Sequence, residues 1–379
     1  MHTRLIFVAG FAMFAMFFGS GNLVFPLTIG METSDHYLSG LAGLFVTGII
    51  VPFLGLLAMI VFQGNRGEAF NQIGKIPAFL LIALMLSLLG PFAVTARCII
   101  VAFGGFQLLW PDVPFYLFSL LFSIISGVAV WRKDKWMDFM GRYLTPILLL
   151  SMILIIVAGL YCSSPLSSTS HTSYTAFMYG INTGYQTMDL LASFFFAVTT
   201  VAFLKKKLPS QDAKSLFKVS LWSSIIGGVL LAAIYSGFVA IGAYYADSLH
   251  AVAPEQRLVV VAGKTLGNFA MPIVATAIWL SCFTTFIALT VLFADFLRKD
   301  VMGEKMSFPQ SLIITLVISF VLSLLGFDAI AGWLAWILSY IYPALIALSV
   351  SLILQKMFFV NLNKIAFWGV LLLVILFRI

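Results

Sequence analysis

Charged side chains are scarce in this sequence. Only 9% of its 379 residues are charged and 62% are hydrophobic, whereas a soluble domain carries roughly 25% charged residues. The apolar runs between the charges are too long for barrel strands and lack period-2 alternation, which excludes a membrane β-barrel. The composition therefore predicts an all-α polytopic membrane protein.

Groups that hold disulfides, metals or nucleotides are also few. Three cysteines give no disulfide framework, and the four histidines form no metal-ligand set. The sequence has no Walker A motif and no long hydrophilic stretch that would hold a nucleotide. We therefore expect no cofactor, no ATPase motor within the chain and no enzymatic activity.

Eleven apolar segments are long enough to span a membrane as helices. They lie near residues 5–30, 38–62, 76–109, 114–130, 143–161, 180–204, 216–246, 266–297, 309–327, 329–354 and 364–378. The first segment has no small-residue cleavage site and leads straight into further segments, so we expect a span and not a cleaved signal peptide. No soluble domain interrupts the pattern, which predicts one transporter domain over residues 1–379.

The basic residues indicate an orientation with the N-terminus in the cytoplasm. The inner side then holds Arg4, Arg66, Lys75, Arg132, Lys133, Lys135, Arg142, Lys205, Lys206, Lys207, Lys214, Lys218, Arg298, Lys299, Lys305, Lys356 and Lys364. The outer side holds only Arg257, Lys264 and Arg378, as the positive-inside rule requires. The net charge of +7 is thus a topology signal and a contact for anionic membrane lipid, and does not indicate a nucleic acid partner.

The first apolar segment is interrupted by residues that make a poor helix, from Gly19 to Pro26. Backbone left unpaired in hydrocarbon is costly, so such a break survives where it is buried in protein or lines a cavity. One interpretation is a proline kink with small packing residues, in which Gly19 and Pro26 have structural or gating roles. The other is a site where free backbone groups bind a solute and an ion.

The first ten segments divide into two halves of five. Because five is an odd number, the second half is inverted in the membrane. Repeat one covers about residues 4–161, repeat two about 180–354, and an extra span about 364–379. The interruption of the first segment has a counterpart in the polar stretch Gly184–Asp189 at the start of the sixth. Paired interruptions at corresponding positions point to a transport site.

Two charged side chains lie at membrane depth, where they are functional candidates. Asp189 is expected to shape the second break, pair with a cation, take up a proton, or cap the helix that follows it. Arg97 needs a partner in this position. It would bind an acidic residue, hold carbonyl groups of a broken helix as a structural clamp, or place positive charge near the substrate path.

Several uncharged groups have two possible roles. Ser281, Thr284 and Thr285 share one face of the eighth segment, where their hydroxyls suit Na⁺ or bond back to carbonyls four residues earlier. The Asn22 amide oxygen coordinates a cation or braces the turn. The backbone N–H groups of Ser20 and Gly21 would lie at the start of the second half-helix, whose positive end suits a carboxylate.

The chain resembles the branched-chain amino-acid:cation symporters, the BrnQ-like carriers. The resemblance rests on Phe17–Pro26, on Gly90–Pro91 with Arg97, and on Gly184–Asp189, and span order extends it over nearly the whole chain. It implies the five-plus-five inverted-repeat, LeuT-like fold with broken spans one and six. It also implies import of leucine, isoleucine and valine through the cytoplasmic (inner) membrane, driven by Na⁺ or H⁺. Another small apolar amino acid or an organic cation is the alternative substrate.

The resemblance also implies a substrate site. A carboxylate cradle would come from backbone near Ser20 and Gly21, and Asn22 and Asp189 would also contact the substrate. Ala192 and Ser193, which follow Asp189, would line the side-chain pocket. Members of this family usually have twelve spans, so the eleven segments imply that the last span of the family pattern is absent from this chain.

An ion site is the second implication of the resemblance. It would lie between backbone near Ala15 and Phe18 in span one and the hydroxyls of Thr284 and Thr285 in span eight. Asn22 matches an asparagine that binds a second ion in sodium symporters.

Overall fold

A computed structural model describes residues 2–131, 136–162, 165–208, 212–267 and 270–377. Throughout these ranges the chain is helical and no strand occurs. Four basic residues of the predicted orientation lie outside the described residues: Arg132, Lys133, Lys135 and Arg378. The prediction of an all-α protein is confirmed.

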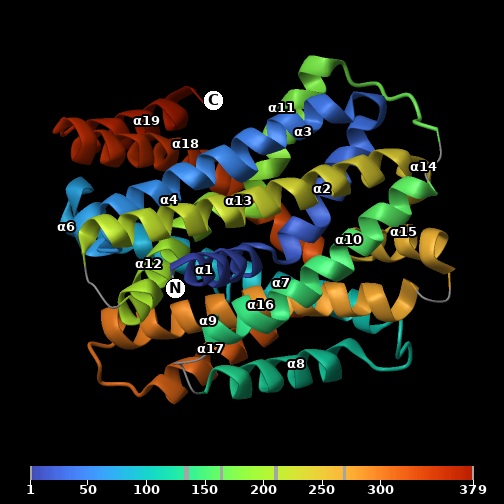
Figure 1. Ribbon diagram of the computed structural model, residues 1–379, viewed down its shortest axis with the longest axis horizontal. Coiled ribbons are helices and arrows are strands. Elements are labelled where there is room, and N and C mark those ends of the chain that lie inside the picture. Colours follow the sequence, from blue (N-terminus) through green and yellow to red (C-terminus); the bar gives the residue numbers. More distant parts are fainter. Residues whose placement is uncertain (1, 132–135, 163–164, 209–211, 268–269, 378–379) are drawn as a thin grey trace.

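The helices follow one another with short connections (Figure 1). The first part of the chain forms α1 (His2–Phe17), α2 (Ser20–Thr33), α3 (Tyr37–Phe45), α4 (Val51–Val61), α5 (Arg66–Phe70), α6 (Lys75–Leu89), α7 (Val94–Phe106), α8 (Phe115–Val130), α9 (Trp136–Phe139) and α10 (Thr145–Tyr161). The second part forms α11 (Ser173–Gly184), α12 (Asp189–Lys207), α13 (Ala213–Tyr244), α14 (Ala246–Leu249), α15 (Arg257–Leu266), α16 (Ala270–Phe296), α17 (Phe308–Ser323), α18 (Phe327–Phe358) and α19 (Asn363–Phe377). Short 3-10 or π-helical turns are η1 (Ser34–His36), η2 (Val46–Ile50), η3 (Asn71–Ile73), η4 (Met140–Leu144), η5 (Tyr185–Thr187), η6 (Pro254–Gln256) and η8 (Leu297–Val301).

Helix length and apolarity fit a membrane protein. Among the described residues, six helical stretches are long and apolar enough to cross a bilayer, and the bent pair of α11 with α12 adds a seventh. The shorter apolar helices are Thr3–Phe17 within α1, α8, α17 and α19. The predicted count of eleven spans stays a prediction, because these four fall short of a full span by themselves.

Two predicted segments differ from the structure. The third, expected as one long helix over 76–109, is two helices, α6 and α7, joined by a turn at Gly90–Ala93 that contains Pro91. The sixth was expected to begin at residue 180, yet α11 already begins at Ser173, where the Thr172 side chain caps it. The second polar interruption therefore has a helix on both of its sides.

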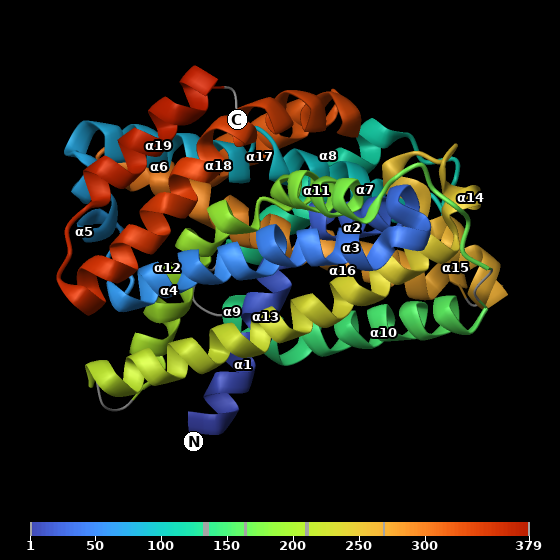
Figure 2. The same ribbon diagram turned by 90° about the horizontal axis from the view of Figure 1, so that it is seen from above.

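α2 and the C-terminal part of α1 lie in the centre of the bundle, where α1 and α2 contact α13 and α16, whereas the N-terminal end of α1 projects from it (Figures 1 and 2). α8 and α17 lie together at one edge, and α18 and α19 at another (Figure 1). Close helix approach needs small residues: a Cβ on Gly30 of α2 would lie 1.9 Å from the Val239 carbonyl of α13. The fold thus surrounds both broken segments with protein.

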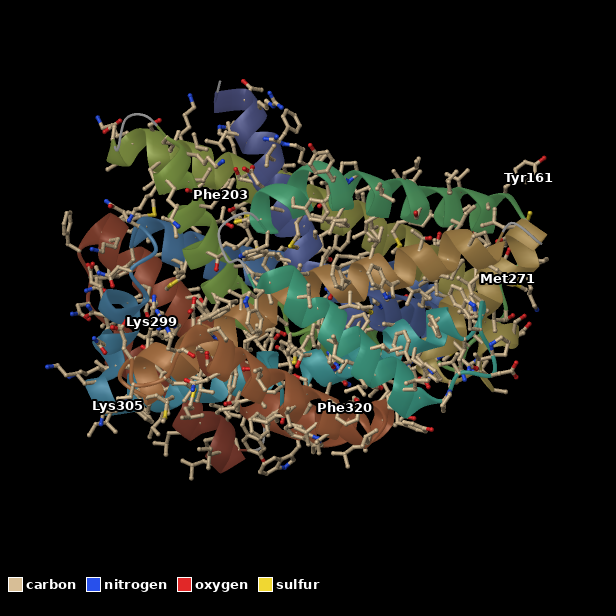
Figure 3. The ribbon with its side chains drawn as sticks, turned by 90° about the horizontal axis from the view of Figure 1, so that it is seen from below. Tyr161, Phe203, Met271, Lys299, Lys305 and Phe320 are labelled. Atoms are coloured by element: carbon tan, nitrogen blue, oxygen red, sulfur yellow. The ribbon has the colours of Figure 1, made fainter. Side chains whose placement is uncertain are left out.

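The two ends of the bundle differ in charge. Lys299 and Lys305 project at one end, and Tyr161 and Met271 lie at the other (Figure 3). The first end also carries ion pairs between loops distant in sequence, including Arg66–Asp300 at 2.5 Å and Lys356–Glu68 at 2.7 Å. Four basic residues assigned to the inner side, Arg66, Lys299, Lys305 and Lys356, therefore lie at one end of the molecule.

Candidate functional site at two helix breaks

The first break occupies only Phe18 and Gly19, between α1 and α2. The Phe18 N–H still donates to the Phe14 carbonyl at 2.8 Å. Gly19 has extended backbone, and its N–H donates to Asn22 Oδ1 at 3.1 Å. The prediction that the interruption extends to Pro26 is therefore wrong, because the Asn22 side chain caps α2 and Pro26 lies inside that helix.

The last carbonyl groups of α1 face three hydroxyls of α16. The Ser281 hydroxyl donates to the Phe18 carbonyl at 2.7 Å. The hydroxyls of Thr284 and Thr285 donate to the carbonyls of Ala15 and Met16, at 3.0 and 2.9 Å. All three side chains are buried. Because the carbonyl end of a helix carries partial negative charge, this group of neutral oxygens suits a small hard cation.

The two helices meet closely at this point. A Cβ on Gly19 would lie 2.8 Å from Cγ2 and 2.9 Å from Oγ1 of Thr285, so this position requires glycine. Back-bonding, the alternative for the hydroxyls, also occurs: Thr284 donates to the Ser281 carbonyl at 3.1 Å. The hydroxyl face is thus turned toward the break, and its binding of an ion stays a prediction.

The second break separates α11 from α12, whose axes differ by 43°. Met188 lies between them in the left-handed region, with φ 62°, and is fully buried. A non-glycine residue pays roughly 1–2 kcal/mol for this conformation, which indicates that packing holds the bend. Met188 is the cap position of α12 and Asp189 its first residue, so the hypothesis that Asp189 is a helix cap is wrong.

Asp189 joins the two breaks. Asn22 Nδ2 donates to both carboxylate oxygens of Asp189, at 3.0 and 3.1 Å, and the Tyr235 hydroxyl donates to Oδ2 at 2.7 Å. Asn22 also bonds the Tyr235 hydroxyl directly. All three side chains are buried. The Asn22 oxygen thus braces the first break while its nitrogen binds the acid of the second; ion binding by Asn22 stays a prediction.

Arg97 lies beside both breaks. Its Nη2 donates to the Gln186 carbonyl at 3.2 Å, on the turn before α12. Its guanidinium lies over the rings of Phe25 and Phe327, whose centroids are 5.3 and 5.5 Å from Cζ. A Cβ on Gly21 would lie 3.0 Å from Nη2. Arg97 therefore holds a broken-helix carbonyl, one of its expected roles, and no carboxylate of the described residues lies within 4.0 Å of it.

Three other residues predicted to contact the substrate, Ser20, Ala192 and Ser193, are also buried. The Ser20 hydroxyl accepts a hydrogen bond from the Cys98 thiol of α7, with 3.6 Å between oxygen and sulfur, so Ser20 faces the helix that also carries Arg97. Ser193 instead packs against α4, where its Oγ would be 2.0 Å from a Cβ on Gly55. Ala192 is 6% exposed. Their contact with a substrate stays a prediction.

Sequence reasoning missed two members of this site. Tyr235 is one of 12 tyrosines, and its only signal was a hydroxyl in the middle of an apolar segment. Gln186 was read as part of a polar stretch, yet its backbone carbonyl binds Arg97 while its side-chain Oε1 is buried and unpartnered. A buried amide at a break is the signal that would have singled it out.

Comparison with known proteins agrees with this geometry. Residues 2–379 match the family described as branched-chain amino acid transport protein. The chain belongs to this family. A relative is the branched-chain amino acid permease BrnQ of Escherichia coli (strain K12), 27% identical over 356 residues that cover 92% of this chain and 80% of the permease. A putative branched-chain amino acid carrier protein of Staphylococcus epidermidis is 26% identical over 382 residues, which cover 95% of this chain and 83% of the carrier.

Two solved transporters share the fold. Mhp1, a nucleobase-cation-symport-1 family transporter in a closed conformation with bromovinylhydantoin bound, has a TM-score of 0.63 and 16% identity over 91% of this chain and 77% of that one. MhsT in complex with L-phenylalanine has a TM-score of 0.64 and 16% identity over 97% of both chains. Family and fold together make the protein a membrane transporter for amino acids and not an enzyme.

Proposed function

We propose that this protein is a secondary symporter that imports leucine, isoleucine and valine together with Na⁺ by alternating access. One observation carries the proposal: opposite helix ends meet at the first break. The carbonyl end of α1 faces the hydroxyls of Ser281, Thr284 and Thr285, and the amide end of α2 begins just after Gly19. A carbonyl end attracts cations and an amide end attracts carboxylates.

The packing supports a five-plus-five inverted repeat. α1 packs on the first half of α13, where Gly10 approaches Ser223. In the same way, α11 packs on α3, the first half of the second predicted segment. α2 packs on the second half of α13, where Gly30 approaches Val239. In the same way, α12 packs on α4, the second half of the second predicted segment. Each half of one broken segment thus uses the matching half of its partner helix. With α1 and α2 counted as one broken span, α3 with α4 as the next, and α8, α17 and α19 each as a span, the chain crosses the membrane eleven times.

The charge at the two ends supports a cytoplasmic N-terminus in the cytoplasmic (inner) membrane. The end that carries Lys299 and Lys305 (Figure 3) would face the cytoplasm and its anionic lipid. The end that carries Tyr161 and Met271 would face outward.

The coupling mechanism follows from which helices each ligand touches. Na⁺ held between α1 carbonyls and α16 hydroxyls would fix α1 on α16. This fixes the first turn of α2 through Gly19, and the amino acid then binds as the outward-open state closes. Coupling requires that ion and substrate both favour the same state of the protein.

Uptake into proteoliposomes tests the proposal. Labelled leucine is expected to accumulate when an inward Na⁺ gradient is imposed and to stay at equilibrium without it. Isoleucine and valine compete with the label, whereas other classes of solute do not. Absence of accumulation under both Na⁺ and H⁺ gradients contradicts symport of branched-chain amino acids.

Coupling to H⁺ is a second candidate, and a specific observation favours it. Asp189 is a buried carboxylate that accepts hydrogen bonds from Asn22 and Tyr235. A group in this position takes up a proton when a conformational change alters its partners. Leucine uptake measured against external pH at fixed Na⁺ separates the candidates, because a proton-coupled carrier is driven by a pH gradient without Na⁺.

Another apolar amino acid or an organic cation is the alternative substrate. The Asn22–Asp189–Tyr235 cluster offers negative charge that an organic cation would need. A competition panel of unlabelled amino acids and amines against labelled leucine distinguishes these substrates.

A further inference from the structure

Arg97 has unused hydrogen-bonding capacity at the junction of the two breaks. Its side chain is fully buried, and neither Nε nor Nη1 has a hydrogen-bond partner among the described residues. Nη2 makes one bond, to the Gln186 carbonyl. A guanidinium has five N–H groups arranged in two forked edges. Whichever Nη2 hydrogen is used, one complete fork of two parallel N–H groups remains free.

Two aromatic rings pack against this guanidinium. It lies over the rings of Phe25 of α2 and Phe327 of α18, and aromatic faces stabilise a cation without using its N–H groups. Asp189 acts on Arg97 by charge, but its oxygens accept bonds from Asn22 and Tyr235. The positive charge of Arg97 is therefore not neutralised by direct contact with an acid.

A second set of donors lies against the guanidinium. The first turn of a helix leaves its N–H groups without intrahelical partners, and here that turn starts at Ser20. Gly21 is close enough that a Cβ would be 3.0 Å from Arg97 Nη2. α2 has 14 residues, so its amide end carries a substantial positive dipole. Two independent sources of N–H donors thus converge on one place.

Two unpartnered acceptors lie on and beside the turn whose carbonyl Arg97 binds. The side-chain Oε1 of Gln186 and the hydroxyl of Tyr342, whose ring packs on Tyr185 of that turn, are both buried and have no hydrogen-bond partner among the described residues. Gln186 also lines a cavity of about 670 Å³ between α11, α18 and α19. A ligand with both a carboxylate and an ammonium group would satisfy the free donors and these acceptors together.

We infer that the free guanidinium fork of Arg97, with the amide end of α2, binds the α-carboxylate of the transported amino acid. This inference rests on the proposed function and adds to it a residue that selects α-carboxylate-bearing substrates. Paired N–H groups of arginine match the two oxygens of a carboxylate in geometry and charge. The selected feature is the carboxylate, so the branched side chain is recognised elsewhere.

Ligands that lack one charged group test the inference. Leucinol has the leucine side chain and amine but no carboxylate, and 4-methylpentanoate has the carboxylate but no amine. Thermal-shift titration of the purified protein gives a Kd for each compound. The wild type is expected to bind leucine at least about 100-fold more tightly than leucinol, since bonds to charged groups are strong when buried.

Arg97→Met removes the fork and keeps an apolar side chain. The expected leucine Kd rises about 30-fold or more, while the leucinol Kd changes less than about threefold because that ligand never used the fork. Arg97→Lys keeps the charge without the fork, and so retains part of the preference. Arg257→Met is the matched control: this arginine bonds Thr28 and the Val252 carbonyl of the outer end, and its loss leaves the leucine-to-leucinol ratio as in the wild type.

Each other outcome overturns the inference in a recognisable way. If the wild type binds leucinol as tightly as leucine, the carboxylate is not recognised, whether or not any variant folds. If Arg97→Met or Arg97→Lys keeps the full wild-type ratio, Arg97 is only a structural clamp. If the wild type binds none of leucine, isoleucine and valine, the proposed function fails and this inference fails with it.

Discussion

The two helix breaks, one between α1 and α2 and the other between α11 and α12, are built differently. The first is short and uncharged: its carbonyls bind hydroxyls of α16, and Asn22 caps the helix that follows. The second bends the chain by 43°, places Met188 in a left-handed conformation and carries Asp189. One break thus presents neutral oxygens, and the other presents charge and strain.

This difference suggests a division of labour. Neutral oxygens at a helix carbonyl end suit a small cation that must bind and leave in each cycle. A buried acid and Arg97, held apart by their own partners, suit a zwitterion that carries both charges. The Asn22–Asp189 bonds tie the two breaks together, so movement at one is transmitted to the other. The variants below, in order of expected effect, separate the two roles.

Removal of the acid is expected to have the largest effect. Asp189→Ala leaves the Tyr235 hydroxyl buried without its acceptor and leaves Asn22 Nδ2 with only the Tyr235 oxygen, at a cost of about 1–3 kcal/mol for the unsatisfied group. Leucine uptake then falls to background and the protein unfolds at a lower temperature, as measured by uptake and by thermal unfolding. Tyr235→Phe, which removes one donor and keeps the acid, is the milder control. Uptake by Asp189→Ala at more than half of the wild-type rate would contradict the account.

The hydroxyls of α16 are expected to control the ion. Thr285→Ala removes an oxygen that lies 2.9 Å from the Met16 carbonyl, and the Na⁺ concentration for half-maximal uptake rises about tenfold, as for one lost ligand. Thr290→Ala is the matched control, since this threonine of α16 is buried and its hydroxyl has no hydrogen-bond partner among the residues that the structure describes. Equal Na⁺ dependence of the two variants excludes the proposed ion site.

Close approach at the first break gives a third prediction. In Gly19→Ala the new methyl group would lie 2.8 Å from Thr285 Cγ2, so Thr285 must move. We expect Na⁺ affinity to fall about threefold to tenfold, in the direction of Thr285→Ala but by less. Gly228→Ala on α13, where a Cβ meets nothing within 4 Å, leaves Na⁺ affinity unchanged. If Gly19→Ala leaves Na⁺ affinity unchanged too, the break does not control the ion.

Strain at the second break gives the smallest effect. Met188→Leu and Met188→Val both keep an apolar side chain, but a β-branched residue is a poor fit for positive φ. Met188→Val is therefore expected to be less stable than Met188→Leu by about 1 kcal/mol, measured by thermal unfolding in the same detergent. Equal stability of the two variants would show that Met188 need not keep this conformation.

The sequence revealed the breaks because glycine, proline and polar residues stand out in apolar segments. It did not reveal their widths: Pro26 lies inside α2, since the Asn22 cap starts that helix early, and α11 begins before the polar stretch. The spacing of Ser281, Thr284 and Thr285 predicted a shared face. Which residues that face meets depends on packing between segments more than 260 positions apart, which composition does not encode.

The partners of the charged residues were the least predictable part. The sequence leaves open for Arg97 an acidic residue, carbonyls of a broken helix or a place near the substrate path, and for Asp189 a cation, a proton, or a role in shaping or capping the break. The structure gives Arg97 a backbone carbonyl and two aromatic rings, and gives Asp189 an amide and a tyrosine. A lone Tyr235 in an apolar segment carries no spacing that marks it.

Reciprocal binding of Na⁺ and leucine tests the central claim most directly. The Kd of leucine is measured by thermal-shift titration without Na⁺ and at saturating Na⁺, and the Kd of Na⁺ without and with saturating leucine. Linkage requires that each ligand lower the Kd of the other by the same factor. We expect this factor to be about 10 or more in the wild type, to fall to about 1 in Thr285→Ala, and to stay at the wild-type value in Thr290→Ala. A leucine Kd that does not depend on Na⁺ would contradict the claim that the two breaks form one coupled site.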